Sequence, residues 1–356
     1  MVGRQLMPSE SVRTKTEPDE LPDDATPSDV QSLVSSDGSS DGSSDGSSDP
    51  PSGHPPHADT VPWRLGGLIK TIRPHQWVKN VFVLAPVVFA KEIFAPELLT
   101  RAALAFGVFC LLAGAVYTMN DLADVDSDRV HPAKRHRPIA SGRVPVTWAR
   151  GLIAVLLVLA LGGAWSLGWA FAAVALGYFA QNVAYSFKLK HVAYVDVGFI
   201  AAGFVLRVIA GGKATGIDVS LYLLLCTALL ALFLGFGKRR HELTSARNQA
   251  AAQRVALESY SKRGLDIALF TTALATIATY VVYTLDPRTR AFFQSDWLWP
   301  SAAFVVLGVL RFVFIVRNRP KAESPTQEML RDGPFVAIIL FWVILVMWVV
   351  YHLKPS

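Results

Sequence analysis

The sequence has few charged residues and almost no cysteine, and both shortages narrow the class of protein that it encodes. Asp, Glu, Lys and Arg make up 17% of its 356 residues, against about 25% in ordinary soluble domains. This deficit argues against a typical cytosolic enzyme. Cys110 and Cys226 both lie within apolar runs, without paired or metal-ligand spacing, so neither a disulfide framework nor a zinc site is supported. We expect both thiols to be buried packing residues.

The first 62 residues lack aromatic side chains and are strongly acidic. They carry 3 Lys or Arg against 12 Asp or Glu, and three consecutive Asp-Gly-Ser-Ser repeats extend from Asp37 to Ser48. Such a segment cannot bury enough apolar surface to offset the entropy cost of ordering. It also lacks the cationic start and apolar stretch of a signal peptide. We therefore predict a disordered, non-catalytic tail over residues 1–62 and a folded domain over residues 63–356.

Long uncharged apolar runs dominate the rest of the chain, and the run from Gly151 to Phe187 has 37 residues. As one helix it would be about 55 Å long, well beyond a roughly 30 Å hydrocarbon core, so we expect it to fold back near Gly168. The sequence predicts an all-α integral membrane protein with nine transmembrane helices. The predicted spans lie near residues 77–94, 102–120, 148–166, 169–187, 194–212, 219–237, 267–285, 297–316 and 334–353.

Lys and Arg residues fall mainly on one side of these nine predicted spans. The segment before the first span and the loops after the even-numbered spans hold 22 of them, whereas the other side holds six. Because cationic loops stay in the cytoplasm, we expect a multi-pass protein of the cell inner membrane with a cytoplasmic N-terminus. The C-terminus is then predicted to lie outside.

The segment after the second predicted span concentrates oxygen-bearing side chains. Asn120, Asp124 and Asp128 recur every four residues, so they would share one face of a continuing helix, and Asp121 lies beside them. Carboxylates this close repel one another unless a cation neutralises them, and Mg²⁺ is typically held by a few carboxylates together with phosphate oxygens. The spacing indicates a magnesium and diphosphate site on the cytoplasmic side, with Asn120, Asp124 and Asp128 as the catalytic set and Asp121 as a further metal ligand.

A solvated acidic helix end is the alternative interpretation of this motif. Basic residues follow the carboxylates within ten positions, and this combination favours an anionic substrate. They are Lys134, Arg135 and Arg137.

Further candidate substrate-binding residues lie after the fourth and sixth predicted spans. The rule that cationic loops stay in the cytoplasm is enough to explain the Lys and Arg residues among them. Asp196 and Arg207 differ, because an ionisable group within a span usually faces a polar cavity or pairs with another charge. The candidates in these regions are Tyr185, Lys188, Lys190, Asp196, Arg207, Lys238, Arg239 and Arg240.

The motif Asn-Asp-x-x-Asp-x-x-x-Asp from Asn120 to Asp128, followed by His-Pro-x-Lys-Arg-x-Arg-Pro-Ile-Ala-Ser-Gly from His131 to Gly142, resembles the first aspartate-rich motif of the UbiA superfamily of intramembrane prenyltransferases. The resemblance covers about residues 65–353 and implies a UbiA-like helical bundle. Typical aromatic prenyltransferases of that superfamily carry a second Asp-x-x-x-Asp motif. Here Asp196 is followed four positions later by Ile200, which departs from that pattern.

Four further segments resemble the decaprenyl-phosphate phosphoribosyltransferase branch of the superfamily. They are Arg-Pro-His-Gln-Trp-Val-Lys-Asn (73–80, with Lys79), Leu-Arg-Val-Ile-Ala-Gly-Gly (206–212), Gly-Lys-Arg-Arg-His-Glu-Leu (237–243) and Leu-Glu-Ser-Tyr (257–260). This resemblance implies Mg²⁺-dependent transfer of 5-phosphoribosyl from phosphoribosyl pyrophosphate to a long polyprenyl phosphate, in the lipid bilayer and without a nucleic-acid partner. A monomer and a homo-oligomer are both compatible with this resemblance.

Two other functions remain open at this stage. An aromatic-acceptor polyprenyltransferase would use the same magnesium site on a prenyl diphosphate, but Ile200 argues against it. A membrane transporter would also accommodate nine spans and intramembrane Asp196 and Arg207. Against transport, no inverted repeat is apparent, and the charged residues gather on one side of the membrane.

Overall fold

The computed structural model describes residues 60–187, 192–245, 259–318, 328–329 and 331–351, and these residues form helices without strands. The helices are α1 Val61–Thr71, η1 Pro74–Leu84, α2 Ala85–Phe89, α3 Pro96–Ala123, α4 Val125–Val130, η2 Lys134–His136, α5 Val146–Ser166, α6 Trp169–Phe187, α7 Val195–Thr215, α8 Leu221–Ser245, α10 Lys262–Leu285, α11 Pro287–Phe293, α12 Ser301–Asn318 and α14 Gly333–Tyr351. Elements η1 and η2 are 3₁₀ helices.

Seven of the described helices are long and apolar enough to cross a membrane, namely α3, α5, α7, α8, α10, α12 and α14. The predicted all-α membrane fold is therefore confirmed, but the count of nine spans is not. Helix α6 coincides with the predicted fourth span and has 19 residues. It carries Gln181 and Asn182 within its length, and it is not among the seven candidate spans.

The first predicted span, residues 77–94, does not form one continuous helix. Its residues are divided between the end of η1, the five-residue helix α2 and the link to α3. Pro86 lies in the first turn of α2, where a missing N–H is tolerated, whereas inside a longer helix it would remove a hydrogen bond. Lys91, in the link after α2, adopts a positive φ of 65°, which a helix cannot continue through.

The long apolar run folds back where the sequence predicts. Helix α5 ends at Ser166 and α6 begins at Trp169. Gly168 between them has a φ of 114°, a conformation that glycine adopts without steric cost. The two helices therefore form an antiparallel pair, and they pack against each other.

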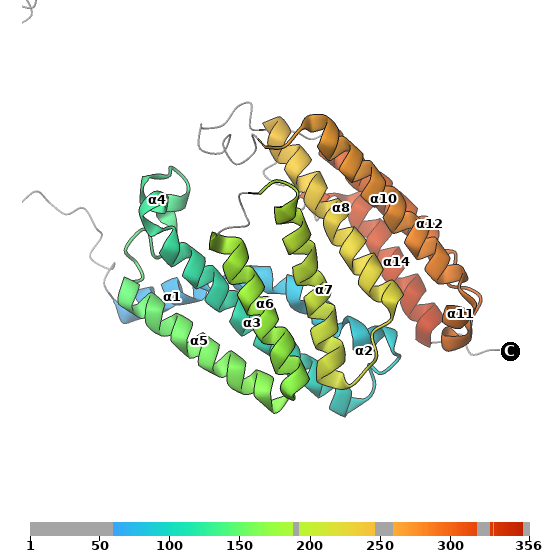
Figure 1. Ribbon diagram of the computed structural model, residues 1–356, viewed down its shortest axis with the longest axis horizontal. Coiled ribbons are helices and arrows are strands. Elements are labelled where there is room, and N and C mark those ends of the chain that lie inside the picture. The colour runs from blue at the N-terminus through green and yellow to red at the C-terminus, as the bar shows by residue number, and fades with distance from the viewer. Residues whose placement is uncertain (1–59, 188–191, 246–258, 319–327, 330, 352–356) are drawn as a thin grey trace, which may run out of the picture. The chain divides into compact units, whose positions relative to one another are not determined.

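The long helices form two groups (Figure 1). Helices α3, α5, α6 and α7 make up one group, and α8, α10, α12 and α14 the other, with α7 packed against α8 between them. The short elements η1 and α2 pack against α3 and α7. Chain direction alternates, so the ends of α3 and α8 and the starts of α7 and α10 lie at one end of the bundle (Figure 1), which we call the polar end.

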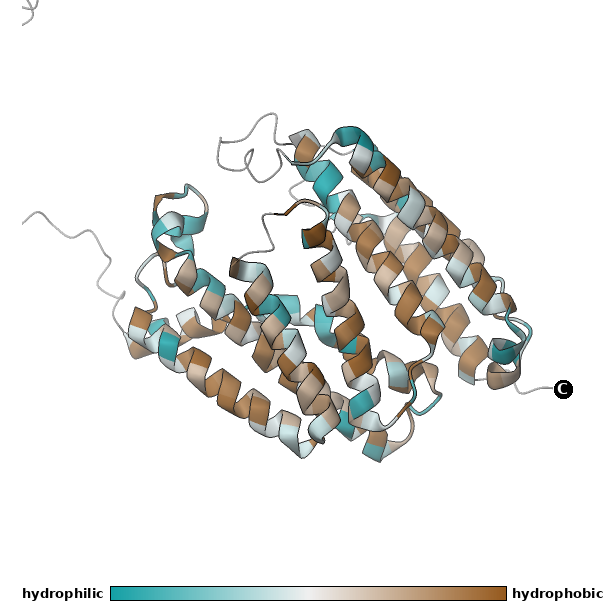
Figure 2. Ribbon diagram, in the orientation of Figure 1, coloured by the Kyte–Doolittle hydropathy of each residue, from teal (hydrophilic) through white to brown (hydrophobic). Residues whose placement is uncertain are grey.

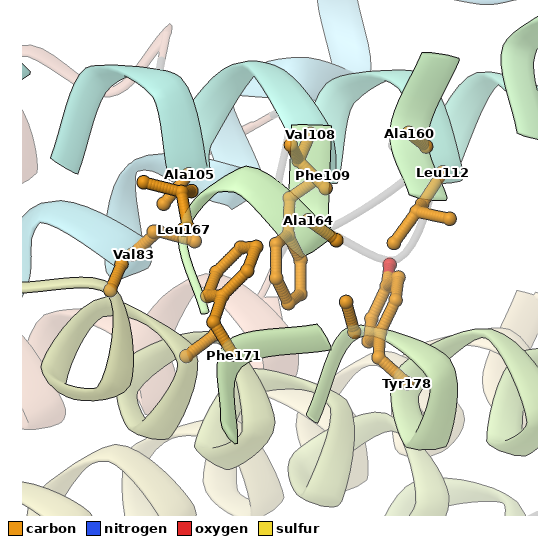
Figure 3. Close-up of a cluster of buried hydrophobic side chains, with 13 residues drawn as sticks. Val83, Ala105, Val108, Phe109, Leu112, Ala160, Ala164, Leu167, Phe171 and Tyr178 are labelled. Atoms are coloured by element: carbon orange, nitrogen blue, oxygen red, sulfur yellow. The ribbon is translucent and has the colours of Figure 1, made fainter. Parts of the chain in front are cut away.

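A core of small and aromatic side chains joins α3, α5, α6 and η1 (Figure 3). Small residues such as Ala105, Ala160 and Ala164 allow close approach of helices that gain little from the hydrophobic effect in lipid. Phe109 packs against Tyr178 with 4.8 Å between ring centroids. The core therefore fixes Tyr178, whose hydroxyl contributes to the polar interior described below.

Polarity along the bundle follows the pattern expected for a membrane protein. Brown, apolar residues occupy much of the helix lengths, and teal, hydrophilic residues gather at α4 and at the end of α8 (Figure 2). Large apolar side chains also face outwards, among them Trp169, Phe341 and Ile344. The fold thus presents apolar surface to lipid and brings charged residues together at the polar end.

Candidate active site

The acidic motif lies where α3 passes into α4, and the helical repeat continues through the junction. Backbone hydrogen bonds link Asp124 N–H to the Asn120 carbonyl (2.9 Å) and Asp128 N–H to the Asp124 carbonyl (2.8 Å). Because each bond spans four residues, Asn120, Asp124 and Asp128 remain on one side of the junction. Asp126 points elsewhere, since its side chain is 90% exposed and pairs with Arg129. This geometry agrees with the helical spacing predicted from the sequence.

Asp121 is paired with two arginines. It is buried, and it accepts from the Nη2 of Arg73 at 2.6 Å and from the Nη1 of Arg137 at 3.1 Å. Arg137 also donates to Asp128 Oδ2 at 2.7 Å. Arg73 reaches this position from the link between α1 and η1, where it adopts a left-handed φ of 52°. The arginines are therefore held in place around the acidic motif.

The residues present fit a hard divalent cation. The Oδ1 atom of Asn120 is buried and has no hydrogen-bond partner, which is costly for a carbonyl oxygen unless something binds it. Carboxylate and amide oxygens are the ligands that Mg²⁺ prefers. Within the described residues, no three His, Cys, Asp or Glu side chains are close enough to form a complete metal site. A metal here would therefore take Asn120, Asp124 and Asp128 together with oxygens of a substrate.

Asp196 forms the centre of a second cluster at the polar end. It is buried at the start of α7, where it accepts from its neighbour Val197 N–H at 2.7 Å, from Arg239 Nε at 2.7 Å and from the Tyr260 hydroxyl. Burial, and next the hydrogen bond to Asp196, raise the pKa of Tyr260 well above its usual range. Asp196 thereby ties α7 to α8 and to the segment before α10.

The cations at the end of α8 differ in how they are paired. Arg239 also binds Glu242 at 2.5 Å, and Tyr185 lies beside it. Arg240 binds Asp266 of α10 through Nε at 2.7 Å. Lys238 is only loosely associated with Glu242, at 3.7 Å. Of the three, Lys238 retains most freedom to bind a substrate.

Arg207 lies deeper, within α7, and among the described residues it donates hydrogen bonds only to neutral groups. Its Nε donates to Asn80 Oδ1 at 2.9 Å and its Nη2 to the Tyr178 hydroxyl at 2.7 Å. The guanidinium also lies over the rings of Tyr178 and Phe204, at 4.8 and 5.1 Å from their centroids. Asn80 in turn donates to Cys110 Sγ at 3.3 Å. Within the part of the chain that the structure describes, Arg207 is thus held by neutral groups and aromatic rings and not by a carboxylate.

Lys79 lies next to Asn80 in η1, outside the seven spanning helices, and remains solvent-accessible. Desolvation by the surrounding protein, followed by the positive charges of Lys238, Arg207 and Arg73, lowers the pKa of Lys79 to about 8. Cations from α7, α8 and the α1–η1 link therefore surround one lysine.

The structure places most of the predicted site residues at or near the polar end and Arg207 deeper in α7, whereas three lysines are not among these contacts. Lys134 in η2 is exposed and lies apart from the carboxylate contacts described above. Lys188 and Lys190 lie outside the described residues. All three remain predictions as substrate-binding residues.

Some residues of the site carry no clear signal in the sequence. Asn80, Tyr178 and Tyr260 contribute neutral side chains from η1, α6 and the segment before α10, far apart in the chain. Asn80 and Tyr260 do belong to segments that resemble the phosphoribosyltransferase branch. Tyr178 lies in an apolar run, and only its packing in three dimensions shows its role.

Comparisons with known proteins agree with these observations. The model of the UbiA prenyltransferase family matches residues 81–329. The decaprenyl-phosphate phosphoribosyltransferase of Mycobacterium tuberculosis (strain ATCC 25618 / H37Rv) is 38% identical over 283 residues, which cover 78% of this chain and 92% of that protein. The protein of the same name from Corynebacterium glutamicum is 36% identical over 289 residues, covering 80% of this chain and 87% of that protein.

Solved structures show the same fold. A UbiA homologue from Archaeoglobus fulgidus bound to DMAPP and Mg²⁺ aligns with a TM-score of 0.58 and 20% identity, over 81% of this chain and all of that chain. A structure of digeranylgeranylglyceryl phosphate synthase aligns with a TM-score of 0.53 and 15% identity, over 81% of this chain and 96% of that one. The chain therefore belongs to the UbiA prenyltransferase family and is a multi-pass membrane transferase.

Proposed function

We propose that this protein transfers 5-phosphoribosyl from phosphoribosyl pyrophosphate to a long-chain polyprenyl phosphate and releases diphosphate. The observation that carries the proposal is the likeness to decaprenyl-phosphate phosphoribosyltransferases, which extends over 92% of the Mycobacterium tuberculosis protein at 38% identity. The site agrees in its chemistry. It combines an acidic helix face with fixed arginines, a combination that suits a donor carrying a diphosphate and a separate 5-phosphate.

The reaction replaces one bond at the anomeric carbon of the ribose. The bond between C1 and the diphosphate oxygen breaks, and its electron pair leaves with the diphosphate. An oxygen of the lipid phosphate forms the new bond to C1. Because that oxygen is already anionic, no strong protein base is needed. The protein must instead hold two anions close together and accommodate the charge that develops on the leaving diphosphate.

The described residues can meet these requirements. Arg73 and Arg137, held by Asp121, are in position to donate to diphosphate oxygens, and Arg–phosphate contacts of this kind are frequently bidentate. A Mg²⁺ ion bound by Asn120, Asp124 and Asp128 would neutralise charge on the leaving group. Lys238 is available for the 5-phosphate at the same end of the bundle.

We place the site on the cytoplasmic side of the cell inner membrane. The proposal rests on the excess of Lys and Arg in the segments at the polar end, since cationic loops stay in the cytoplasm. A water-soluble sugar diphosphate would then reach the site from the aqueous side, while the lipid acceptor enters from the bilayer.

An aromatic-acceptor polyprenyltransferase is the second candidate. A 4-hydroxybenzoate octaprenyltransferase from Polaromonas naphthalenivorans is 34% identical over 113 residues, but these cover only 30% of this chain. Position 200 carries Ile, and Asp196 is committed to Arg239 and Tyr260. A second carboxylate pair for a prenyl diphosphate is therefore missing from this helix. Membership of a transferase family leaves the transporter alternative without support.

Two labels on the donor test the proposed reaction. Purified protein is incubated with Mg²⁺, a polyprenyl phosphate and phosphoribosyl pyrophosphate labelled either in the ribose or in the terminal phosphate of the diphosphate. We expect the ribose label in the lipid phase and the diphosphate label in water. Both labels in the lipid phase, or neither label released from the donor, would contradict the proposal. Asp128→Asn provides the inactive control.

A further inference from the structure

Arg207 and Lys79 are two cations without a counter-charge among the described residues, and Asn80 relates them: it accepts a hydrogen bond from Arg207 and follows Lys79 directly in η1. Arg207 is only 8% exposed. Within the described part of the chain, no carboxylate lies within 4.0 Å of either side chain. The other arginines of the site, in contrast, each bind a carboxylate. A buried cation with only neutral partners is costly inside a membrane protein and usually marks a functional position.

The surroundings hold Arg207 in place instead of neutralising it. Asn80 and Tyr178 accept hydrogen bonds from Arg207, and two aromatic rings cover its guanidinium. The low pKa of Lys79 reflects repulsion by Arg207, Lys238 and Arg73 in addition to desolvation. An anion placed between Lys79 and Arg207 would relieve this repulsion.

An apolar cavity lies beyond the two aromatic rings, Phe204 and Phe82, that separate it from Arg207. Phe204, which lies beneath the Arg207 guanidinium, packs edge-on against Phe82 with 5.0 Å between ring centroids. Phe82 lines a cavity of about 270 Å³, whose other walls come from α2, α8, α10, α12 and α14. Its lining is overwhelmingly apolar, with residues such as Leu230, Phe312 and Ile339. Its size is close to the lower end of the roughly 300–1,000 Å³ of small-molecule sites.

Depth along α7 separates Arg207 from the polar end. Arg207 follows Asp196 by eleven residues on the same helix, or about 16 Å at 1.5 Å per residue. A soluble sugar phosphate is bound most readily at the polar end, whereas a lipid phosphate can enter from the bilayer. Tyr117 of α3 bridges the two regions, because it lies under Arg73, at 5.1 Å, and within electrostatic reach of Arg207.

We propose that Lys79 and Arg207 bind the phosphate of the lipid acceptor and that the first isoprene units of its chain enter the cavity behind Phe82. This inference rests on the proposed function and assigns one phosphate within it. The donor then occupies Arg73, Arg137 and the acidic face, and the acceptor phosphate approaches from the other side of Tyr117. The site distinguishes its two anionic substrates by placing an apolar cavity beside only one of the two cation groups.

Separate binding measurements on the full-length protein in detergent test the two cations. Lys79→Gln and Arg207→Lys are each compared with Lys213→Gln, which removes an exposed cation from the far end of α7. The probes are a labelled polyprenyl phosphate without donor, and labelled phosphoribosyl pyrophosphate with Mg²⁺ but without lipid. Because Lys79 is accessible, Lys79→Gln should fold normally, and thermal unfolding checks each variant.

We expect Lys79→Gln to bind the polyprenyl phosphate at least about tenfold more weakly, the lower end of what a charge-assisted contact contributes. Binding of phosphoribosyl pyrophosphate should change less than threefold, and Lys213→Gln should bind both probes normally. Unchanged lipid binding, or a loss confined to the sugar donor, would overturn the assignment.

A cavity-filling variant tests where the chain lies. At Gly308 of α12, which lines the cavity, an added Cβ would meet only Ile338, at 3.8 Å. Gly308→Leu should therefore fill part of the cavity without a clash at Cβ. We expect at least fivefold weaker binding of a long polyprenyl phosphate, with inorganic phosphate competing as in the wild type. Gly177→Leu, at an exposed glycine with open space around it, is the control. Equal lipid binding by both variants would contradict the cavity assignment.

These measurements separate the acceptor site from the proposed reaction. If the wild-type protein binds polyprenyl phosphate through Lys79 but transfers no ribose, the reaction is wrong and the anion site stands. If the wild type transfers ribose but Lys79→Gln keeps the wild-type affinity for the lipid, the reaction stands and the site assignment is wrong.

Discussion

Neighbouring residues of the acidic motif have different environments, and this difference bears on what each can do. Asp121 is enclosed by Arg73 and Arg137, so its main effect is to fix two cations. Asp128 shares Arg137 with it, whereas Asn120 has an unpartnered buried oxygen. The sequence predicts all of these residues as metal ligands. We propose Asn120, Asp124 and Asp128 for that role and a positioning role for Asp121.

Asp124→Asn or Asp128→Asn should lower kcat at least about a thousandfold while the protein still inserts and purifies, because each change removes a charged ligand but keeps the shape. Asp126→Asn should stay within about threefold of the wild type, since the Asp126 side chain is exposed and faces away. Steady-state kinetics with saturating Mg²⁺ compares the three variants. Equal losses at positions 124, 126 and 128 would contradict the helical-face interpretation.

The lowered pKa of Lys79 predicts that kcat/KM for the lipid acceptor depends on pH. Its pKa is lowered to about 8, so the ammonium that would bind the acceptor loses its proton as the pH rises through this value. We expect kcat/KM for the polyprenyl phosphate to fall above about pH 8, because this parameter reports the free enzyme. In Lys79→Arg the guanidinium stays charged, and the fall should disappear. A decline that persists unchanged in Lys79→Arg would assign the titration to another group.

At the scale of elements, the position of η1 decides the geometry of the site. It carries Lys79 and Asn80 between α3 and α7. At Gly211 of α7, an added Cβ would lie 1.9 Å from the backbone oxygen of Val83. Only glycine allows this approach, so Gly211 sets the distance between η1 and α7 and therefore between Asn80 and Arg207.

Gly211→Ala should displace η1 and destabilise the protein by at least about 1–3 kcal/mol, the usual cost of overpacking. Activity should fall further than stability, since the Asn80–Arg207 contact depends on this spacing. Thermal unfolding and kcat/KM are measured together, with Gly177→Ala as the matched change at an exposed helical glycine. A Gly211→Ala protein with wild-type stability and activity would show that the close approach is unimportant.

The sequence predicts those parts of this fold that depend on local pattern. The length of the apolar runs, which predicts long helices, and the chain reversal at Gly168 are local properties, and the structure confirms both. The same applies to the four-residue spacing of Asn120, Asp124 and Asp128. Local pattern does not predict the division of the first span into η1 and α2, because a proline such as Pro86 and a lysine near a helix end such as Lys79 also occur in membrane helices. Contacts such as Arg207 with Tyr178 join distant segments, and no spacing rule predicts them.

For the molecule as a whole, charge is divided unevenly between the acidic first 62 residues and the basic remainder, which has 31 Lys or Arg and 16 Asp or Glu. The acidic segment has too few apolar residues to form a core of its own. Deleting residues 1–59 should therefore leave membrane insertion and kcat/KM within about threefold of the full-length protein. The two proteins are compared in the same detergent and by membrane fractionation. A loss greater than about tenfold would reveal a function for the acidic segment.

The central claim is that this transferase uses a phosphosugar donor and a lipid phosphate acceptor. The most direct measurement offers the purified protein both substrate pairs in one reaction: phosphoribosyl pyrophosphate with a polyprenyl phosphate, and a prenyl diphosphate with 4-hydroxybenzoate. Mass spectrometry of the lipid phase identifies the products. We predict polyprenyl phosphoribose as the product, without prenylated 4-hydroxybenzoate. Prenylated 4-hydroxybenzoate with no consumption of phosphoribosyl pyrophosphate would contradict the proposed function, although the fold and the acidic site would stand.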